Sequence, residues 1–175
     1  GEDLGEDAFL ARASRAFERG LAMVQIREKA RPRERRDAFA SKVVTLARAH
    51  RASIVINGSE DDVRRLRADG VHWTSDALGR ATRRPPGMLV GASCHTRDEL
   101  ARAASFDVDY AVVGPVKATS THPDAKPLVW EGFERTVART RGPVYARGGL
   151  VPEDLARARA HGAHGIAMRR AAWPA

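Results

Sequence analysis

The sequence predicts an α/β fold, because short apolar segments alternate with amphipathic segments along almost all of its 175 residues. Segment 53–57, Ser-Ile-Val-Ile-Asn, is nearly wholly apolar, as a strand buried on both faces is. Other segments repeat apolar side chains at helical spacing, for example Phe9, Ala13 and Phe17. Strict alternation of this kind is typical of parallel βα units.

Start and stop signals place the individual elements. Ser59 with Asp62, and Thr96 with Glu99, have the spacing of capping boxes that begin helices. Gly20 is expected to end the first helix. The predicted helices span 6–20, 31–50, 59–70, 96–106, 130–140 and 152–162, and the predicted strands span 21–28, 53–57, 70–73, 89–95, 110–116, 143–149 and 165–170.

Seven predicted strands, with a helix ahead of the first, fit a (β/α)8 TIM barrel over residues 1–175 as a single domain. Such a barrel needs one more strand, which is missing from this chain, and the chain also lacks an initiating Met. We therefore expect a fragment of a longer polypeptide. A doubly wound open sheet is the alternative architecture, but it would carry a glycine-rich turn after its first strand.

Composition limits the classes of partner. The formal net charge of +8 favours anionic partners, yet the arginines are interleaved with Asp and Glu, as on solvated helix faces. The sequence shows no motif of an RNA-binding, zinc-finger or helix-turn-helix module and no apolar run of membrane-spanning length. The single cysteine, Cys94, fits a reducing compartment. We expect a cytoplasmic protein with a phosphorylated small-molecule partner, and neither nucleic acid nor membrane.

Polar residues and glycines gather where the predicted strands end, which is where a barrel of this type carries its active site. Glycines let backbone N–H groups approach an anion, hydroxyl groups add donors, and cations add charge. This set therefore predicts a phosphate-binding site. The strand-end residues are Gln25, Arg27, Lys29, Asn57, His72, Ser93, His95, Thr119, Ser120, Thr121, His122, Arg147, Gly148, Gly149, Arg169 and Arg170.

A structural interpretation stands beside each of these residues. A polar residue at a strand end is often just where the chain meets water, and Gly148-Gly149 alone is a turn signal. His72, Trp73 and Cys94 are expected to be packing residues. The coincidence across seven strand ends favours the phosphate site.

Five segments carry a resemblance to a known family. They are "VQIREK", "INGSEDDVRRLRADGVH", "VGASCHTRDELARA", "DYAVVGPVKATSTH" and "VYARGGLVPEDLARARAHGAHGIA". In this order the chain resembles thiamine phosphate synthase and its relative, the thiazole tautomerase. The variants "ASCH", "THPDAKPLVW" and "GIAMRRAAW" look more like a subgroup in which the barrel is fused behind a Nudix hydrolase domain.

The resemblance implies a reaction and assigns roles. The family couples 4-amino-2-methyl-5-hydroxymethylpyrimidine diphosphate with thiazole phosphate, giving thiamine phosphate and pyrophosphate. Gln25, Arg27 and Lys29, with Asn57 beside them, would bind the pyrimidine diphosphate. Ser93 would reach the departing pyrophosphate. The remaining implied ligands are Thr119 and Thr121 for the thiazole phosphate or the pyrophosphate, and Gly149, next to Gly148, for the thiazole phosphate.

Three positions depart from the family pattern. The resemblance implies Mg²⁺ as cofactor, with an Asp directly after Asn57, where this chain has Gly58. A second Asp is expected at position 77, which is Ala77, so that Asp76 is the remaining candidate ligand. The lysine expected after the Thr-x-Thr segment is His122. The Mg²⁺ ligands are thus largely absent, and we expect impaired synthase chemistry.

Three functions remain open at this point. The first is a thiamine phosphate synthase, weak or active through altered ligands. The second is an isomerase acting on a thiazole phosphate, with His95 or His122 as the acid-base group. The third is a non-catalytic module that binds a phosphorylated thiamine precursor for an attached Nudix domain.

Overall fold

The computed structural model describes residues 5–27, 32–119 and 126–173. The chain divides into two compact units, which are residues 1–72 with 173–175, and residues 73–172. In both units parallel strands alternate with helices, as the sequence predicts. None of the helices in the described ranges combines the length and the apolar character that crossing a bilayer requires.

The first unit consists of three βα repeats. Its elements are α1 (Glu6–Glu18), β1 (Met23–Ile26), α2 (Arg33–Ala49), β2 (Ser53–Ile56), α3 (Glu60–Leu66) and β3 (Gly70–Trp73, of which Gly70 to His72 belong to this unit). β2 pairs in parallel with β1 and with β3. In β1, buried Val24 and Ile26 alternate with exposed Met23 and Gln25, so one face of the strand packs in the core and the other carries polar groups.

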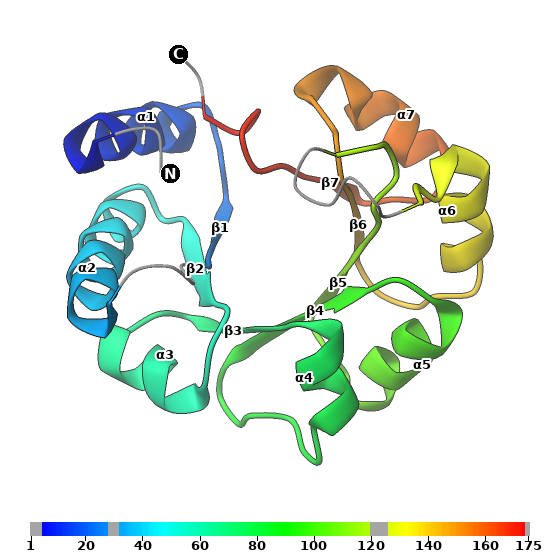
Figure 1. The fold of residues 1–175 in the computed structure, drawn as a ribbon, viewed down its shortest axis with the longest axis horizontal. Coiled ribbons are helices and arrows are strands. Elements are labelled where there is room, and N and C mark those ends of the chain that lie inside the picture. Colours follow the sequence, from blue (N-terminus) through cyan, green and yellow to red (C-terminus); the bar gives the residue numbers. More distant parts are fainter. Residues whose placement is uncertain (1–4, 28–31, 120–125, 174–175) are drawn as a thin grey trace. The chain divides into compact units, whose positions relative to one another are not determined.

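The second unit carries four consecutive parallel strands with helices along one face (Figure 1). Its elements are α4 (Ser75–Arg80), β4 (Leu89–Cys94), α5 (Arg97–Ser105), β5 (Tyr110–Val113), α6 (Val129–Val137), β6 (Val144–Arg147), the 3-10 helix η1 (Pro152–Asp154), α7 (Leu155–Ala160) and β7 (Gly165–Ala167). The core of this unit includes Phe133 of α6, Cys94 of β4 and Val113 of β5.

Local signals locate several element ends correctly. Both capping boxes are confirmed, with Ser59 and Asp62 at the start of α3 and Thr96 and Glu99 at the start of α5. α1 ends at Glu18, and Gly20 follows with a positive φ of 93°.

Several elements differ from the predictions, among them β7, which was predicted over 165–170 and ends at Ala167. The segment between 73 and 89, where no helix was predicted, contains α4, which Thr74 caps through its hydroxyl. The predicted strand 110–116 ends at Val113, and Pro115, which follows soon after, has no backbone N–H to extend the ladder. The predicted strand 143–149 ends at Arg147, so the two glycines lie in the turn beyond the strand.

The three residues predicted to serve in packing are all removed from solvent to a large degree. His72 is buried in β3, and Cys94 is buried in β4. The ring of Trp73 meets Phe106 edge-on, with 5.6 Å between centroids. Burial raises the pKa of the Cys94 thiol to about 12, which keeps the thiol protonated and unreactive at neutral pH.

Candidate phosphate-binding site

The predicted site residues fall into both units. Gln25, Arg27 and Asn57 belong to the first unit. Ser93, His95, Thr119, Gly148 and Gly149 belong to the second. Lys29, Ser120, Thr121 and His122 lie outside the described residues.

In the first unit, the end of β1 presents polar groups to solvent. Gln25 is exposed within the strand, and Arg27 is exposed directly after it. The residue between them, Ile26, is buried, so Gln25 and Arg27 project from the same side of the extended chain.

Asn57 follows β2 and is held by the adjacent strand. Its backbone N–H donates to the carbonyl oxygen of Ile26 at 2.9 Å. Asn57 also lines a small pocket with Arg36 and Asp62. The pocket therefore brings an amide, a guanidinium and a carboxylate together at the end of β2.

Gly58 occupies the position where the family resemblance implies a metal-binding Asp. A Cβ atom at Gly58 would lie 2.8 Å from Oδ2 of Asp62 and 3.1 Å from Cγ2 of Ile56. The Asp62 carboxylate also accepts from the backbone N–H of Ser59 at 3.0 Å and from the hydroxyl of Ser59 at 2.9 Å. The helix cap thus fills the space beside Gly58.

The acidic groups of the first unit's α3 are engaged by arginines. Arg64 pairs with Glu60 and Asp61, each at 3.1 Å, and Arg65 pairs with Asp62. Burial acts to raise the pKa of Asp62, but the bonds from Ser59 and Arg65 outweigh it and hold that pKa below its ordinary value.

Asp76 in the second unit is paired as well. It lies in the first turn of α4, where its Oδ2 accepts from Arg80 at 2.7 Å. Its side chain is 77% exposed. Across residues 5–27, 32–119 and 126–173, no three His, Cys, Asp or Glu side chains gather as a metal site would require. At the two positions where the resemblance implies carboxylate ligands, the chain has Gly58 and Ala77, which cannot coordinate Mg²⁺ through a side chain.

In the second unit, the segment after β5 and the turn after β6 are joined by backbone hydrogen bonds. The N–H of Val116 donates to the carbonyl of Arg147 at 2.8 Å, and the N–H of Lys117 donates to the carbonyl of Gly148 at 3.1 Å. The segment from 115 to 118, which Thr119 follows in the chain, therefore runs alongside the Gly148-Gly149 turn.

This close approach requires glycine at both turn positions. Gly148 has φ +97°, and a Cβ there would lie 2.6 Å from Cα of Pro115. Gly149 has φ +66°, and a Cβ there would lie 2.6 Å from the carbonyl oxygen of Ala118. A side chain at either position would meet backbone as well as strain the left-handed conformation.

His95 lies beside the same group of loops. Its Nδ1 is 2.7 Å from the carbonyl oxygen of Gly114, which can only accept, so Nδ1–H is the donor. The neutral imidazole then carries its lone pair on Nε2. The backbone N–H of His95 donates to Glu99, which fixes the residue at the start of α5. Ser93 is half-buried two residues earlier in β4.

Sequence reasoning missed one pair in this region. Nζ of Lys117 lies 2.6 and 2.8 Å from the two carboxylate oxygens of Asp154. One signal pointed to Lys117, because lysine is rare in this chain and this one stands two residues before Thr119. Its partner, 37 positions further on, had no local signal.

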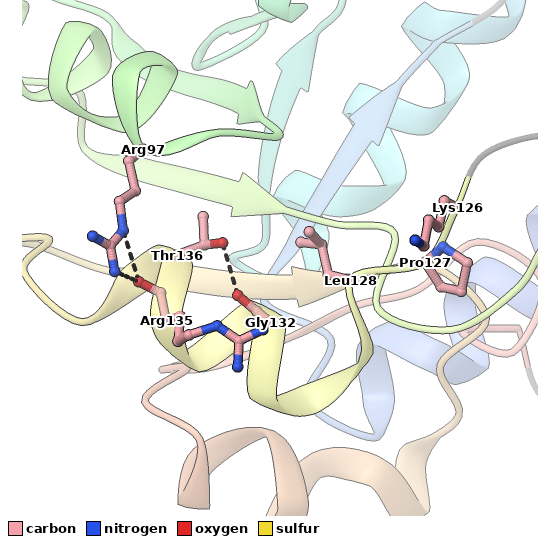
Figure 2. A pocket seen from close by; sticks show the side chains of 7 residues that line it. All are labelled: Arg97, Lys126, Pro127, Leu128, Gly132, Arg135 and Thr136. Atoms are coloured by element: carbon pink, nitrogen blue, oxygen red, sulfur yellow. Dashed lines mark hydrogen bonds between the residues drawn. The ribbon is translucent and has the colours of Figure 1, made fainter.

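A larger pocket of the second unit, about 480 Å³, lies along α5 and α6 rather than at the glycine turn (Figure 2). The Arg97 guanidinium donates to the carbonyl oxygen of Arg135 there, with Nε at 2.9 Å. Thr136 donates to the carbonyl of Gly132 at 2.8 Å. Lys126 and Leu128, which precede α6, also line it. The Arg97 guanidinium and the Thr136 hydroxyl are thus engaged within the protein.

Several known proteins are similar to this chain in sequence and in fold. A thiamine-phosphate synthase of Methanospirillum hungatei is 32% identical over 160 residues, covering 89% of this chain and 78% of that protein. One from a Synechocystis species is 32% identical over 169 residues, and the chain spans about half of it, 49%. The solved thiamine phosphate pyrophosphorylase from Pyrococcus furiosus matches with a TM-score of 0.75 at 25% identity, over 91% of this chain and 78% of that one.

These matches agree with the α/β barrel fold and with the family resemblance in the sequence. The model of the thiamine monophosphate synthase family matches residues 1–172, which is nearly the whole chain. The Nudix fusion has no counterpart in these matches. The parallel βα units, the glycine turn and the family match lead to one conclusion: this chain belongs to the thiamine monophosphate synthase family.

Proposed function

We propose that this protein couples a pyrimidine methyl diphosphate to a thiazole phosphate, giving thiamine phosphate and pyrophosphate. The observation that carries the proposal is the Gly148-Gly149 turn, held by backbone hydrogen bonds against the segment that Thr119 follows. Positive-φ glycines and a hydroxyl are groups suited to a phosphate. The names of the family and of the relatives at 32% identity support the same reaction.

The proposed reaction is a substitution at the methylene carbon of the pyrimidine. The bond from this carbon to the diphosphate oxygen breaks, and its electron pair leaves with pyrophosphate. The lone pair of the thiazole nitrogen then forms the new C–N bond. Because the leaving group carries the developing negative charge, donors placed around it lower the barrier. In this proposal Ser93 donates to the pyrophosphate, and Gln25 and Arg27 bind the pyrimidine diphosphate.

The proposal draws no step through a metal ion. In the described residues, Gly58 has no side chain and Asp62 serves the helix cap, while Asp76 pairs with Arg80. Charge on the diphosphate is then balanced by cationic side chains such as Arg27. We expect turnover well below that of an enzyme with a full Mg²⁺ site, since each ~1.4 kcal/mol of lost stabilisation slows the reaction tenfold.

The test is turnover with both phosphorylated substrates, followed by chromatographic detection of thiamine phosphate. Thr119→Ala and Arg27→Ala should each reduce kcat/KM, while Lys42→Ala, which alters an exposed pair with Glu6 in the first unit, should not. Detection of thiamine phosphate with this pattern supports the proposal. Absence of product at high enzyme concentration contradicts it, and tight binding of thiazole phosphate without product would instead favour a binding module.

One observation favours isomerisation of a thiazole phosphate as a second candidate. The Nδ1–H of His95 donates to the carbonyl oxygen of Gly114, so Nε2 is the ring nitrogen that can accept a proton. An isomerase needs such a group and needs no support for a leaving group. His95→Asn should abolish isomerisation in this case. Undiminished activity of that variant would remove His95 as the acid-base group.

Two features of the wider protein belong to the same proposal. We propose that the natural protein carries a Nudix hydrolase domain ahead of this chain, supported by the segments "ASCH" and "THPDAKPLVW". We also propose a cytoplasmic location, supported by a buried, unpaired Cys94. The upstream coding sequence tests the first point, and a fluorescent fusion of the whole protein tests the second.

A further inference from the structure

Asp154 is a charged side chain in a buried place. It is 9% exposed and ends the 3-10 helix η1, five residues after Gly149. Its Oδ2 accepts from the backbone N–H of Val151 at 3.0 Å. A carboxylate removed from water in this way needs a counter-charge, because an unpaired buried charge is costly.

Lys117 supplies that counter-charge from the loop after β5. Its ammonium contacts both carboxylate oxygens, at 2.6 and 2.8 Å. The bond from Lys117 is the main cause that lowers the pKa of Asp154 below its ordinary value. Asp154 therefore keeps its charge, and the pair persists, throughout the neutral range.

The backbone of Lys117 contacts the glycine turn directly. Its N–H donates to the carbonyl of Gly148 at 3.1 Å, and its Cβ would lie 3.0 Å from a Cβ on Gly149. Lys117 thus contacts the turn through its main chain, while its side chain binds Asp154, five residues beyond Gly149 in the sequence.

The other edge of this loop is anchored as well. The N–H of Leu128 donates to the carbonyl of Pro115 at 2.8 Å, and the N–H of Val129 donates to the carbonyl of Val116 at 3.1 Å. On the opposite edge, the N–H groups of Val116 and Lys117 bind the turn, and the Lys117–Asp154 pair adds a side-chain link to that edge.

We propose that Lys117 and Asp154 are positioning residues that hold segment 116–118 against the Gly148-Gly149 turn and thereby set the affinity of the turn for a substrate phosphate. The inference rests on the proposed function for its ligand, but the geometry of the turn can be measured without it. Backbone donors must be placed to within about 0.5 Å for a site of this kind to bind well.

The kinetic test compares four variants. Lys117→Met keeps the length of the side chain and removes its charge, so KM for thiazole phosphate should rise about tenfold with kcat nearly unchanged. Lys117→Arg should restore most of the affinity. Asp154→Asn keeps an acceptor for Val151 and should resemble Lys117→Met. Lys42→Met is the matched control, because Lys42 pairs with Glu6 at 2.6 Å in the first unit, and it should leave KM unchanged.

The double variant Lys117→Met/Asp154→Asn removes both charges, so it guards against misfolding caused by an unpaired Asp154. It should be no worse than the poorer single variant, because both changes break one interaction. A fall in kcat with unchanged KM, failure of Lys117→Arg to restore affinity, or additive losses in the double variant would each overturn the inference.

A second measurement separates this inference from the proposed function. The backbone amide signals of Gly148 and Gly149 are followed by NMR while inorganic phosphate is added. In Lys117→Met both signals should start from shifted positions and respond to phosphate at about tenfold higher concentration than in the wild type. Unshifted signals with an unchanged response overturn the positioning role. A wild type that shows this response without forming thiamine phosphate contradicts only the proposed reaction.

Discussion

Gly58 illustrates at the residue scale how one position removes a family feature. An Asp there would add a Cβ 2.8 Å from the Asp62 carboxylate, which already holds the cap of α3. The end of the Asp62 side chain would therefore have to move to admit a metal-binding side chain at this position. In this chain the Asp62 carboxylate caps α3, and it also forms an ion pair with Arg65.

Gly149 allows a prediction that separates backbone strain from close contact. Gly149→Ala should lower the free energy of unfolding by more than the ~1 kcal/mol of a strained alanine, because its Cβ would meet the carbonyl of Ala118 at 2.6 Å. It should also weaken binding of a phosphate substrate. Urea unfolding and kcat/KM measure the two effects.

Gly20→Ala is the matched control for that prediction. Gly20 has a positive φ of 93°, but a Cβ there would meet nothing within 4 Å. We expect it to lose about 1 kcal/mol of stability from strain alone, with unchanged kcat/KM. Equal losses of stability in the two variants would show that the close contact at Gly149 is unimportant.

At the scale of elements, α5 connects helix capping with the candidate site. The Thr96 hydroxyl accepts from the N–H of Glu99 at 3.2 Å, and the Glu99 carboxylate accepts from the N–H groups of Thr96 and His95. The capping box therefore extends one residue upstream and fixes the backbone of His95. A residue with a possible acid-base role thus owes its placement to a helix signal.

Thr96→Ala should lower the free energy of unfolding by about 1 kcal/mol, since it removes a helix cap. Urea unfolding followed by circular dichroism measures the loss. Thr45→Ala makes the same chemical change inside α2, where the Thr45 hydroxyl donates to the carbonyl of Ser41. This control should be neutral or slightly stabilising, because alanine favours helix interiors. A similar loss in both variants would argue against the cap.

The sequence predicted which helices and strands exist better than it predicted where they end. Alternation located every strand, and the capping boxes at Ser59 and Thr96 began helices as expected. The segment before β4 was misjudged, since α4 is only six residues long and is too short to show a helical period. β5 was predicted too long, because the apolar run continues through Val116 although the hydrogen-bonded ladder stops at Val113.

At the scale of the whole molecule, buried ionisable groups predict how stability depends on pH. Burial raises the pKa of the Cys94 thiol to about 12 and that of Tyr110 above its ordinary value. In the unfolded chain these groups release protons near about pH 8.5 and pH 10. The folded state then holds more protons than the unfolded state, so stability falls as the pH rises.

We therefore expect a flat free energy of unfolding from neutral pH to about pH 8.5 and a decline above it. The slope should reach at most about 1.4 kcal/mol per pH unit for each group. Guanidinium unfolding at several pH values measures the profile. Cys94→Ala is the control, and its decline should begin only near about pH 10, where Tyr110 takes over. A wild-type profile that stays flat through that range would contradict the assignment.

The sequence by itself determined the parallel βα units, the start of α3 and of α5, and the strand ends that carry Gln25, Ser93 and the two glycines. These features depend on neighbours a few residues apart, through side-chain period and local hydrogen bonds. Only the tertiary structure decided that Lys117 meets Asp154 and that His95 meets Gly114. Those contacts join positions distant along the chain, and no local pattern encodes which side chains will face one another once the strands have paired.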